Sequence, residues 1–437
     1  MAASDTVTRP LPNPFLAVAA VIFGASILQV AHGLLSTLLP LRMNAAQATT
    51  VDIGLMATAY STGFILGCLF VSRLIGAVGH IRVFAAFAAM ASAVTLAFTI
   101  APEPALWMAV RSMQGFAMAA LFTVAESWLN ERTPSAERGR VMAAYMVVTK
   151  LAFAGGQLSL MLSDIGGLLF FMAASAAFSL SLIPVAMTRA PSPKVPKLKT
   201  LGLRQIYRVA PAAAVGCFAI GLMNAAVINI GPLYGARQAL SPSNIAALMA
   251  AMQIGSLLLQ WPLGWISDRV DRRVIIVTAG AMVVVLSLAI AILGTRWPQA
   301  LYVLFCLWGG FSLSIYAVFI AHANDFAGQD ERVAVTSTLL LAWAVGSVIG
   351  PTAATLTMNT VGPAGLFYYV AAVATAMTGF VAYRMTRRPA RPVDERARFV
   401  NVPASSPQLP TLDPRTARSG MTTDEGGSPG DERSDVD

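Results

Sequence analysis

Residues 106–130 read LWMAVRSMQGFAMAALFTVAESWLN, an apolar stretch that carries Arg111, Gln114 and Glu126. At about 1.5 Å per residue, a helix of this length spans the roughly 30 Å hydrocarbon layer of a bilayer. A guanidinium in that layer costs between about 2.5 and 17 kcal/mol, depending on how much water reaches it. Arg111 must therefore face other protein or a wet cavity, which makes it a candidate functional residue.

The composition of the whole chain is that of a membrane protein. Of the 437 residues, 56% are hydrophobic and 12% are charged, and the mean hydropathy is +0.67. Soluble domains are nearer one quarter charged. The three cysteines lie in apolar runs, which argues against a disulfide framework or a thiolate metal site. The net charge of +9 does not indicate nucleic acid, because the basic residues lie in short loops beside apolar runs.

Twelve apolar runs predict membrane-spanning helices. They cover residues 14–39, 52–75, 82–101, 105–130, 138–162, 166–187, 209–234, 242–265, 273–294, 298–323, 333–358 and 363–385. The first run is too long for a signal-peptide core, so we expect an uncleaved helix. With both termini inside, the inner loops and flanking segments hold 22 Lys and Arg, and the outer loops hold three. The positive-inside rule therefore predicts that both termini are cytoplasmic.

A basic, proline-rich segment divides the predicted spans six and six. We expect an N-terminal segment at 1–13, a first bundle at 14–187, a cytoplasmic linker at 188–208 and a second bundle at 209–386. The linker is expected to lie on the anionic leaflet. Residues 387–437 are rich in Pro, Ser, Asp and Arg, which predicts a disordered tail.

The two halves also repeat in sequence. Asn130 and Arg138 correspond to Asn324 and Arg332, and at the same offset Gly156 falls on Gly350. Because six is even, a duplicated six-helix unit keeps its orientation in the membrane. Parallel repeats of this kind are one layout of secondary transporters.

Residues 264–273, GWISDRVDRR, resemble the G-x-x-x-D-R-x-x-R-R loop signature of the major facilitator superfamily. Arg111 to Gly115 resembles its R-x-x-Q-G signature. ESWLNER and the HAND sequence at 322–325 are similar to the YcaD-like branch of uncharacterised bacterial members. The resemblance implies an all-α membrane fold with twelve helices in two six-helix bundles related by a pseudo-twofold axis. It also implies a secondary transporter of the bacterial inner membrane that rocks these bundles about a midplane cavity.

The same resemblance implies that charges on the 264–273 loop hold a cytoplasmic gate. Asp268 can accept charge-assisted bonds from an arginine or a helix N-terminus. The first-half copy has Ser72 in place of this acid, so the second half would carry more of the gating. Ordinary positive-inside charge is the alternative. The candidate gating residues are Asp268, Arg269, Arg272, Arg273, Arg73, Arg138, Arg332, His322, Asn324 and Asp325.

The fourth and fifth spans are expected to form a hairpin that turns near Thr133. Reflection about that turn places Arg111 and Lys150 within one or two helical turns in depth. The cations Arg111 and Lys150 and the amides Gln114 and Gln157 would then lie at mid-membrane, with no acid at their level. Such a group would attract an organic anion or zwitterion. The alternative is structural: Lys150 snorkels or pairs with Glu126, and the amides form helix–helix seams. The candidate substrate-binding residues are Arg111, Gln114, Lys150, Gln157, Gln29, His32, Asn224, Asn229, Gln253 and Gln260.

Proton coupling requires a group that changes charge near the working pH. Glu126 and His32 are the candidates, because both lie within predicted spans. The structural alternatives are a packing role for His32 and a helix-end pair of Glu126 with Arg138 or Arg140.

Two further functions stay open at this stage. Drug–proton antiporters of the superfamily often carry Gly-xxx-Gly-Pro in the fifth span, but here Gly346-xxx-Gly350-Pro351 lies in the eleventh. Efflux by antiport therefore lacks its usual marker, and a transporter-like sensor is the lower alternative. We expect no enzyme activity and no cofactor, because the chain lacks a Ser/His/Asp set and a phosphate-binding loop. The expected partners are a small-molecule substrate, a proton and the lipid bilayer, and no nucleic acid is expected. The protein is expected to be a monomer.

Overall fold

The computed structural model describes residues 14–101, 103–134, 137–187, 202–294, 296–328, 331–387 and Phe399. The expected N-terminal segment, linker residues 188–201 and the tail other than residues 387 and 399 lie outside this part. The last residues of the expected linker, 203–208, form with Val209 a short helix, α8 (Leu203–Val209), which packs against α9 and α14.

The described chain is helical throughout, because a backbone in lipid must satisfy its polar groups internally. The first half comprises α1 (Pro14–Ala45), α2 (Thr50–Val78), α3 (His80–Ala97), α4 (Pro104–Arg132), α5 (Arg138–Leu158), the 3-10 helix η1 (Ser159–Leu162), α6 (Leu169–Leu180) and α7 (Leu182–Ala186). After α8, the second half comprises α9 (Pro211–Arg237), α10 (Pro242–Ser267), α11 (Arg272–Leu293), α12 (Ala300–Ser312), α13 (Ile315–Phe326), α14 (Arg332–Val361) and α15 (Gly365–Arg387).

These helices make twelve segments long and apolar enough to cross a membrane, which confirms the predicted number. Two of the segments are broken helices, α6 with α7 and α12 with α13. The expected end of the first span was wrong: α1 continues through Pro40 to Ala45. Membrane helices tolerate an interior proline because neighbouring groups satisfy the carbonyl that it frees.

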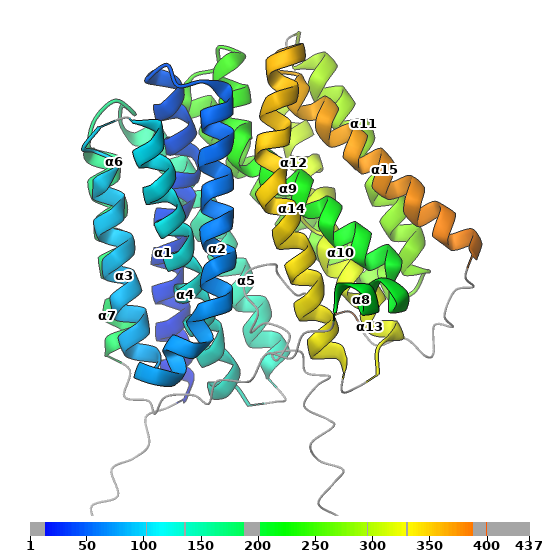
Figure 1. Cartoon of the computed structure of the whole chain (residues 1–437), viewed down its shortest axis with the longest axis horizontal. Coiled ribbons are helices and arrows are strands. Elements are labelled where there is room, and N and C mark those ends of the chain that lie inside the picture. Colours follow the sequence, from blue (N-terminus) through cyan, green and yellow to red (C-terminus); the bar gives the residue numbers. More distant parts are fainter. Residues whose placement is uncertain are drawn as a thin grey trace, which may run out of the picture.

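The helices form two six-helix bundles that stand side by side. In Figure 1, α1–α7 (blue to teal) lie on the left and α9–α15 (green to orange) lie on the right. The two bundles meet where α1, α2 and α5 of the first half contact α9, α10 and α14 of the second. We call the end with α8 and the α2–α3, α4–α5, α10–α11 and α13–α14 connections the basic end (Figure 1).

The duplication is visible in how the helices approach one another. A Cβ on Gly156 of α5 would lie 2.1 Å from the carbonyl oxygen of Val30 on α1. A Cβ on Gly350 of α14 would lie 2.2 Å from that of Leu222 on α9. Small residues allow such close backbone contacts between membrane helices. The two glycines that the sequence repeat pairs therefore make the same contact in the two halves.

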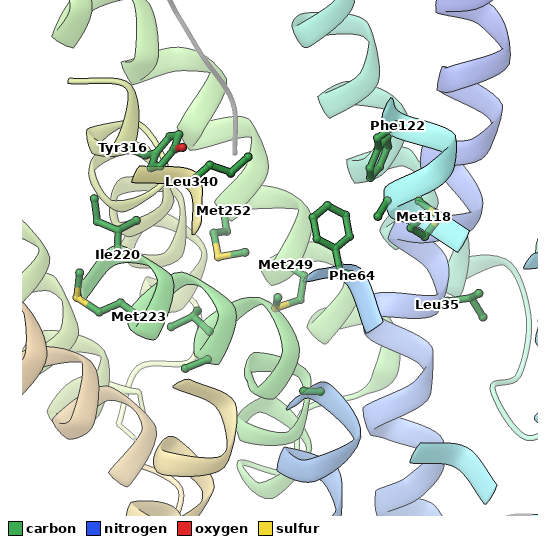
Figure 2. Packing of buried hydrophobic residues seen from close by; sticks show 14 of the residues in the cluster. Leu35, Phe64, Met118, Phe122, Ile220, Met223, Met249, Met252, Tyr316 and Leu340 are labelled. Carbon is green, nitrogen blue, oxygen red and sulfur yellow. The ribbon is translucent and has the colours of Figure 1, made fainter. Parts of the chain in front are cut away.

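Away from the basic end, the halves are joined directly between α2 and α14. The Thr58 hydroxyl donates to the Val348 carbonyl at 2.7 Å and lies 2.8 Å from the Thr352 hydroxyl. Elsewhere buried apolar side chains fill the bundles. Figure 2 shows Leu35, Met118 and Phe122 in the first half and Ile220, Met223 and Met252 in the second.

Candidate functional site

A cavity of about 280 Å³ lies between the two halves. Helices α1, α2, α4 and α5 line it from the first half, and α9, α10 and α14 line it from the second. Its volume is close to the lower end of the range for ligand sites, about 300–1,000 Å³. Five of the predicted substrate-binding residues line this cavity: Gln29, His32, Lys150, Asn229 and Gln253.

Lys150 reaches from the first half to the second. Its ammonium donates to the Ser256 hydroxyl at 2.6 Å and to the Gln260 side-chain oxygen at 3.0 Å. Both acceptors lie on α10, four residues apart and so on one face of that helix. Gln260 therefore acts on the site through Lys150, without lining the cavity itself.

Arg111 lies behind the cavity wall, 2% exposed. Its guanidinium carbon is 4.3 Å from the centre of the Tyr60 ring, and its terminal nitrogen donates to the Gln114 side-chain oxygen. An arginine over an aromatic face gains a cation–π interaction, which is stronger when water is excluded. Arg111 thus faces protein, as its charge requires, and it reaches the cavity only through Tyr60.

Tyr60 connects Arg111 to His32. The Tyr60 hydroxyl lies 3.0 Å from His32 Nε2, and the Gln29 oxygen lies 3.3 Å from His32 Nδ1. Because an amide oxygen only accepts, the Gln29 contact requires a proton on Nδ1, and in the neutral form of the ring Nε2 then accepts from the tyrosine. Tyr60 is not among the residues predicted from the sequence, because nothing in the pattern of a single span distinguishes a cavity tyrosine from a packing one.

Glu126 is fully buried on α4. The Tyr145 hydroxyl hydrogen bonds to its carboxylate, and Tyr145 itself lines the cavity. This predicted proton-coupling residue is therefore one side chain away from the cavity, whereas His32 lies in its wall.

Two other predicted amides lie away from the cavity. Asn224 accepts from the Ser312 hydroxyl at 2.6 Å and donates to the Ser312 carbonyl at 3.3 Å. These bonds hold the break between α12 and α13, so Asn224 forms the helix–helix seam that was the structural alternative. Gln157 is fully buried on α5 and does not line the cavity.

At the basic end, the charges of the 264–273 loop pair within the second half. Arg272 lies 3.1 Å from Asp325 and 3.4 Å from Asp268, and Arg273 lies 2.8 Å from Asp271. The backbone N–H of Phe399 donates to Asp268 at 2.8 Å. The structure therefore brings three predicted gating residues together, Asp268, Arg272 and Asp325.

The remaining predicted gating residues make separate local contacts. Arg269 lies over the Trp265 ring at 3.7 Å, and Arg73 lies over Phe70 at 5.8 Å. Arg138 donates to the Thr133 carbonyl, and Asn324 contacts Thr336. His322, Arg273 and Arg384 line one small pocket, and Arg332 begins α14.

The chain is similar to known transporters along most of its length. The family model described as Major Facilitator Superfamily matches residues 21–241 and again 213–416. The uncharacterized MFS-type transporter YcaD of Escherichia fergusonii is 28% identical over 354 residues, which covers 80% of this chain and 91% of that protein. YcaD of Salmonella newport is 27% identical over 373 residues, covering 84% and 94%.

Solved transporter structures share the fold at low sequence identity. The nucleoside transporter NupG superposes with a TM-score of 0.71 at 12% identity, covering 85% of this chain and all of that one. A bacterial homolog of the human lysosomal transporter Spinster, in an inward-facing and occupied conformation, gives 0.69 at 14% identity and covers 89% and 99%. Family match, helix number and duplicated bundles agree, and the chain belongs to the major facilitator superfamily of multi-pass membrane transporters.

Proposed function

We propose that this protein is a secondary transporter that moves a small organic anion through the cavity between its halves. Lys150 carries this proposal: it is a cation in a wall in which none of the described lining residues is Asp or Glu. A single positive charge with low-dielectric surroundings attracts anions and repels cations. Gln29, Asn229 and Gln253 supply neutral polar groups beside it.

Alternating access would follow from the duplicated bundles. Parallel repeats of this type rock about a fixed central site. A rocking motion would have to break or rearrange the hydrogen bonds that join the halves, including the Thr58–Val348 bond and the bonds of Lys150 to α10. At the basic end, the Asp268, Arg272 and Asp325 cluster would hold one gate position.

Proton coupling is assigned to His32 in the cavity wall, with Glu126 as the buried second group. A second proton on His32 would turn Nε2 from an acceptor into a donor. Tyr60 would then have to accept instead of donate, which changes the hydrogen bonding beneath Arg111. Entry of a monovalent anion together with a proton adds no net charge to the cavity.

The distribution of basic residues supports a location in the bacterial inner membrane with both termini cytoplasmic. The basic end would then face the cytoplasm. We propose bundles at 14–187 and 209–386, which the contacts among the described helices support; the contacts of α8 with α9 and α14 favour adding α8 to the second bundle.

Uptake by proteoliposomes tests the proposal. Purified protein is screened with organic anions, amino acids and cationic drugs, with and without an imposed pH gradient. We expect anion uptake that an outside-acid gradient raises. Lys150→Ala and Arg111→Ala abolish it at normal expression, whereas Arg237→Ala, an exposed cation at the end of α9, leaves it unchanged.

The same screen separates the alternative. Movement of cationic drugs against a proton gradient, with no anion moved, would replace this proposal by drug efflux. Normal anion uptake in both Lys150→Ala and Arg111→Ala would remove these two residues from the site.

A further inference from the structure

Aromatic rings form much of the cavity wall. Six line it: Tyr60, Phe64, Phe122, Tyr145, Phe153 and Trp343. Four of them, Tyr60, Phe64, Phe122 and Phe153, lie on the first-half side, where each is close to His32 or to another of the four. The His32 ring centre lies 5.6 Å from that of Tyr60, 6.2 Å from Phe122 and 5.2 Å from Phe153.

Phe64 closes this group of rings. Its centre lies 6.3 Å from that of Tyr60 and 6.5 Å from that of Phe122 (Phe64 and Phe122 are labelled in Figure 2). Such spacings are those of rings in edge or offset contact. We call Tyr60, Phe64, Phe122, Phe153 and His32 the ring cluster. It offers a flat, planar ligand several aromatic contacts within a small volume.

The charged side of the cavity lies at Lys150. An ammonium has three N–H donors, and Ser256 and Gln260 accept two of them. The third is available to an acceptor in the cavity. Gln253 lies three residues before Ser256, on the same face of α10, and lines the cavity. Lys150 and Gln253 together can hold one carboxylate, with a charge-assisted bond from the lysine.

The lining also argues against an ammonium on the ligand. None of the described lining residues carries a carboxylate, and Glu126 lies behind Tyr145. Aromatic rings can hold a cation by their faces. Here Lys150 shares the same small cavity, and its charge opposes a second cation. One fixed cation likewise matches one carboxylate and not two.

We infer that the transported anion is an aromatic monocarboxylate, with its ring against the ring cluster and its carboxylate on Lys150 and Gln253. This rests on the proposed function of anion transport and narrows it, because it excludes zwitterions, dicarboxylates and purely aliphatic acids as preferred substrates.

A matched ligand series tests the inference on the full-length protein. Binding to purified protein is measured by calorimetry, and uptake is measured in proteoliposomes. The probes are benzoate, phenylacetate and 3-phenylpropionate. Each is paired with its cyclohexyl acid, its alcohol and an analogue carrying an added ammonium, such as phenylalanine; phenylsuccinate adds a second carboxylate.

The tightest aromatic acid is expected to bind about three- to tenfold better than its cyclohexyl partner, the gain from aromatic contacts. It is expected to bind at least about tenfold better than the alcohol, which lacks the charge-assisted bond. Lys150→Met removes the preference for acid over alcohol, and Lys150→Arg retains it. Phe122→Leu removes the preference for the aromatic over the cyclohexyl ring.

The outcomes separate this inference from the function beneath it. Equal binding of the cyclohexyl acid or of phenylalanine overturns the inference and leaves anion transport standing. So does uptake of aliphatic acids such as hexanoate without any aromatic acid. If no anion of either kind binds or moves, the proposed function fails as well.

Discussion

Lys150 on α5 donates to Gln260 on α10 at 3.0 Å, so a cavity cation also ties the first half to the second. Because the same ammonium is the proposed partner of the substrate, a carboxylate bound to its third N–H would draw the ammonium toward the cavity and weaken its two bonds to α10. A charged acceptor is stronger than the neutral Ser256 hydroxyl and the Gln260 amide. Substrate binding and loosening of the contact between α5 and α10 would then be one event.

Gln260→Glu tests that relationship. A carboxylate at this position gives Lys150 a permanent charged partner, which strengthens the bond between the halves and competes with the substrate. We expect turnover to fall at least about tenfold, equivalent to about 1.4 kcal/mol. Uptake at saturating substrate measures this. Gln238→Glu, at the end of α9, is the matched control. Unchanged turnover in Gln260→Glu would show that the bond to α10 does not limit transport.

Tyr60→Phe separates the ring of Tyr60 from its hydroxyl. The variant keeps the ring beneath Arg111 but removes the group that contacts His32 Nε2. We expect wild-type uptake to rise as the outside is made more acidic, because a proton enters with the anion. In Tyr60→Phe this rise should be lost, while exchange of anions without a gradient continues. Uptake as a function of the imposed pH gradient is the measurement.

Tyr368→Phe, an exposed tyrosine on α15, should retain the full response to the gradient. A Tyr60→Phe protein with normal pH dependence would move the coupling role to the second candidate. Glu126→Gln would then be the variant that loses the response.

Neighbouring glycines on α5 give a test of packing. A methyl at Gly156 would lie 2.1 Å from the Val30 carbonyl oxygen, whereas one at Gly155 meets nothing within 4 Å. We expect Gly156→Ala to lower stability by about 1–3 kcal/mol, as overpacking does. Gly155→Ala should leave it unchanged or raise it slightly, because alanine favours helix. Thermal unfolding in detergent compares the two. Equal stabilities would contradict the close contact of α1 and α5.

The ion pairs at the basic end differ in burial and so in expected cost. Arg272 and Asp325 have side chains 1% and 3% exposed, whereas Asp271, the partner of Arg273, is 21% exposed. Removing one member of a buried pair costs about 3–5 kcal/mol, because the other charge stays buried. Asp271 keeps more contact with solvent, so removing its charge is expected to cost less. Asp325→Asn should therefore lower the unfolding temperature much more than Asp271→Asn. A larger drop in unfolding temperature for Asp271→Asn than for Asp325→Asn would contradict the assignment of Arg272 and Asp325 as the more stabilising pair at the basic end.

Much of the site was predictable from the sequence, because polar and charged side chains are rare inside membrane spans. Lys150, Gln29, His32, Asn229 and Gln253 stood out because amides and charges are costly inside apolar runs, and all five line the cavity. The same reasoning selected Asn224, which instead holds the broken helix at Ser312. A polar residue in a membrane span must be hydrated or hydrogen bonded. The sequence does not show whether a cavity or another helix meets that need.

The amino-acid sequence by itself determined the number of spans, the duplication and the asymmetry of the basic loops, because a bilayer imposes length, apolarity and charge placement on each segment separately. Only the tertiary structure decided that Tyr60 stands between Arg111 and the cavity, and that Phe64, Phe122 and Phe153 form its wall. An aromatic side chain is equally stable against lipid, within a bundle or around a cavity. Which of these it meets depends on helix rotation and tilt, and those are set by contacts between residues far apart in the chain.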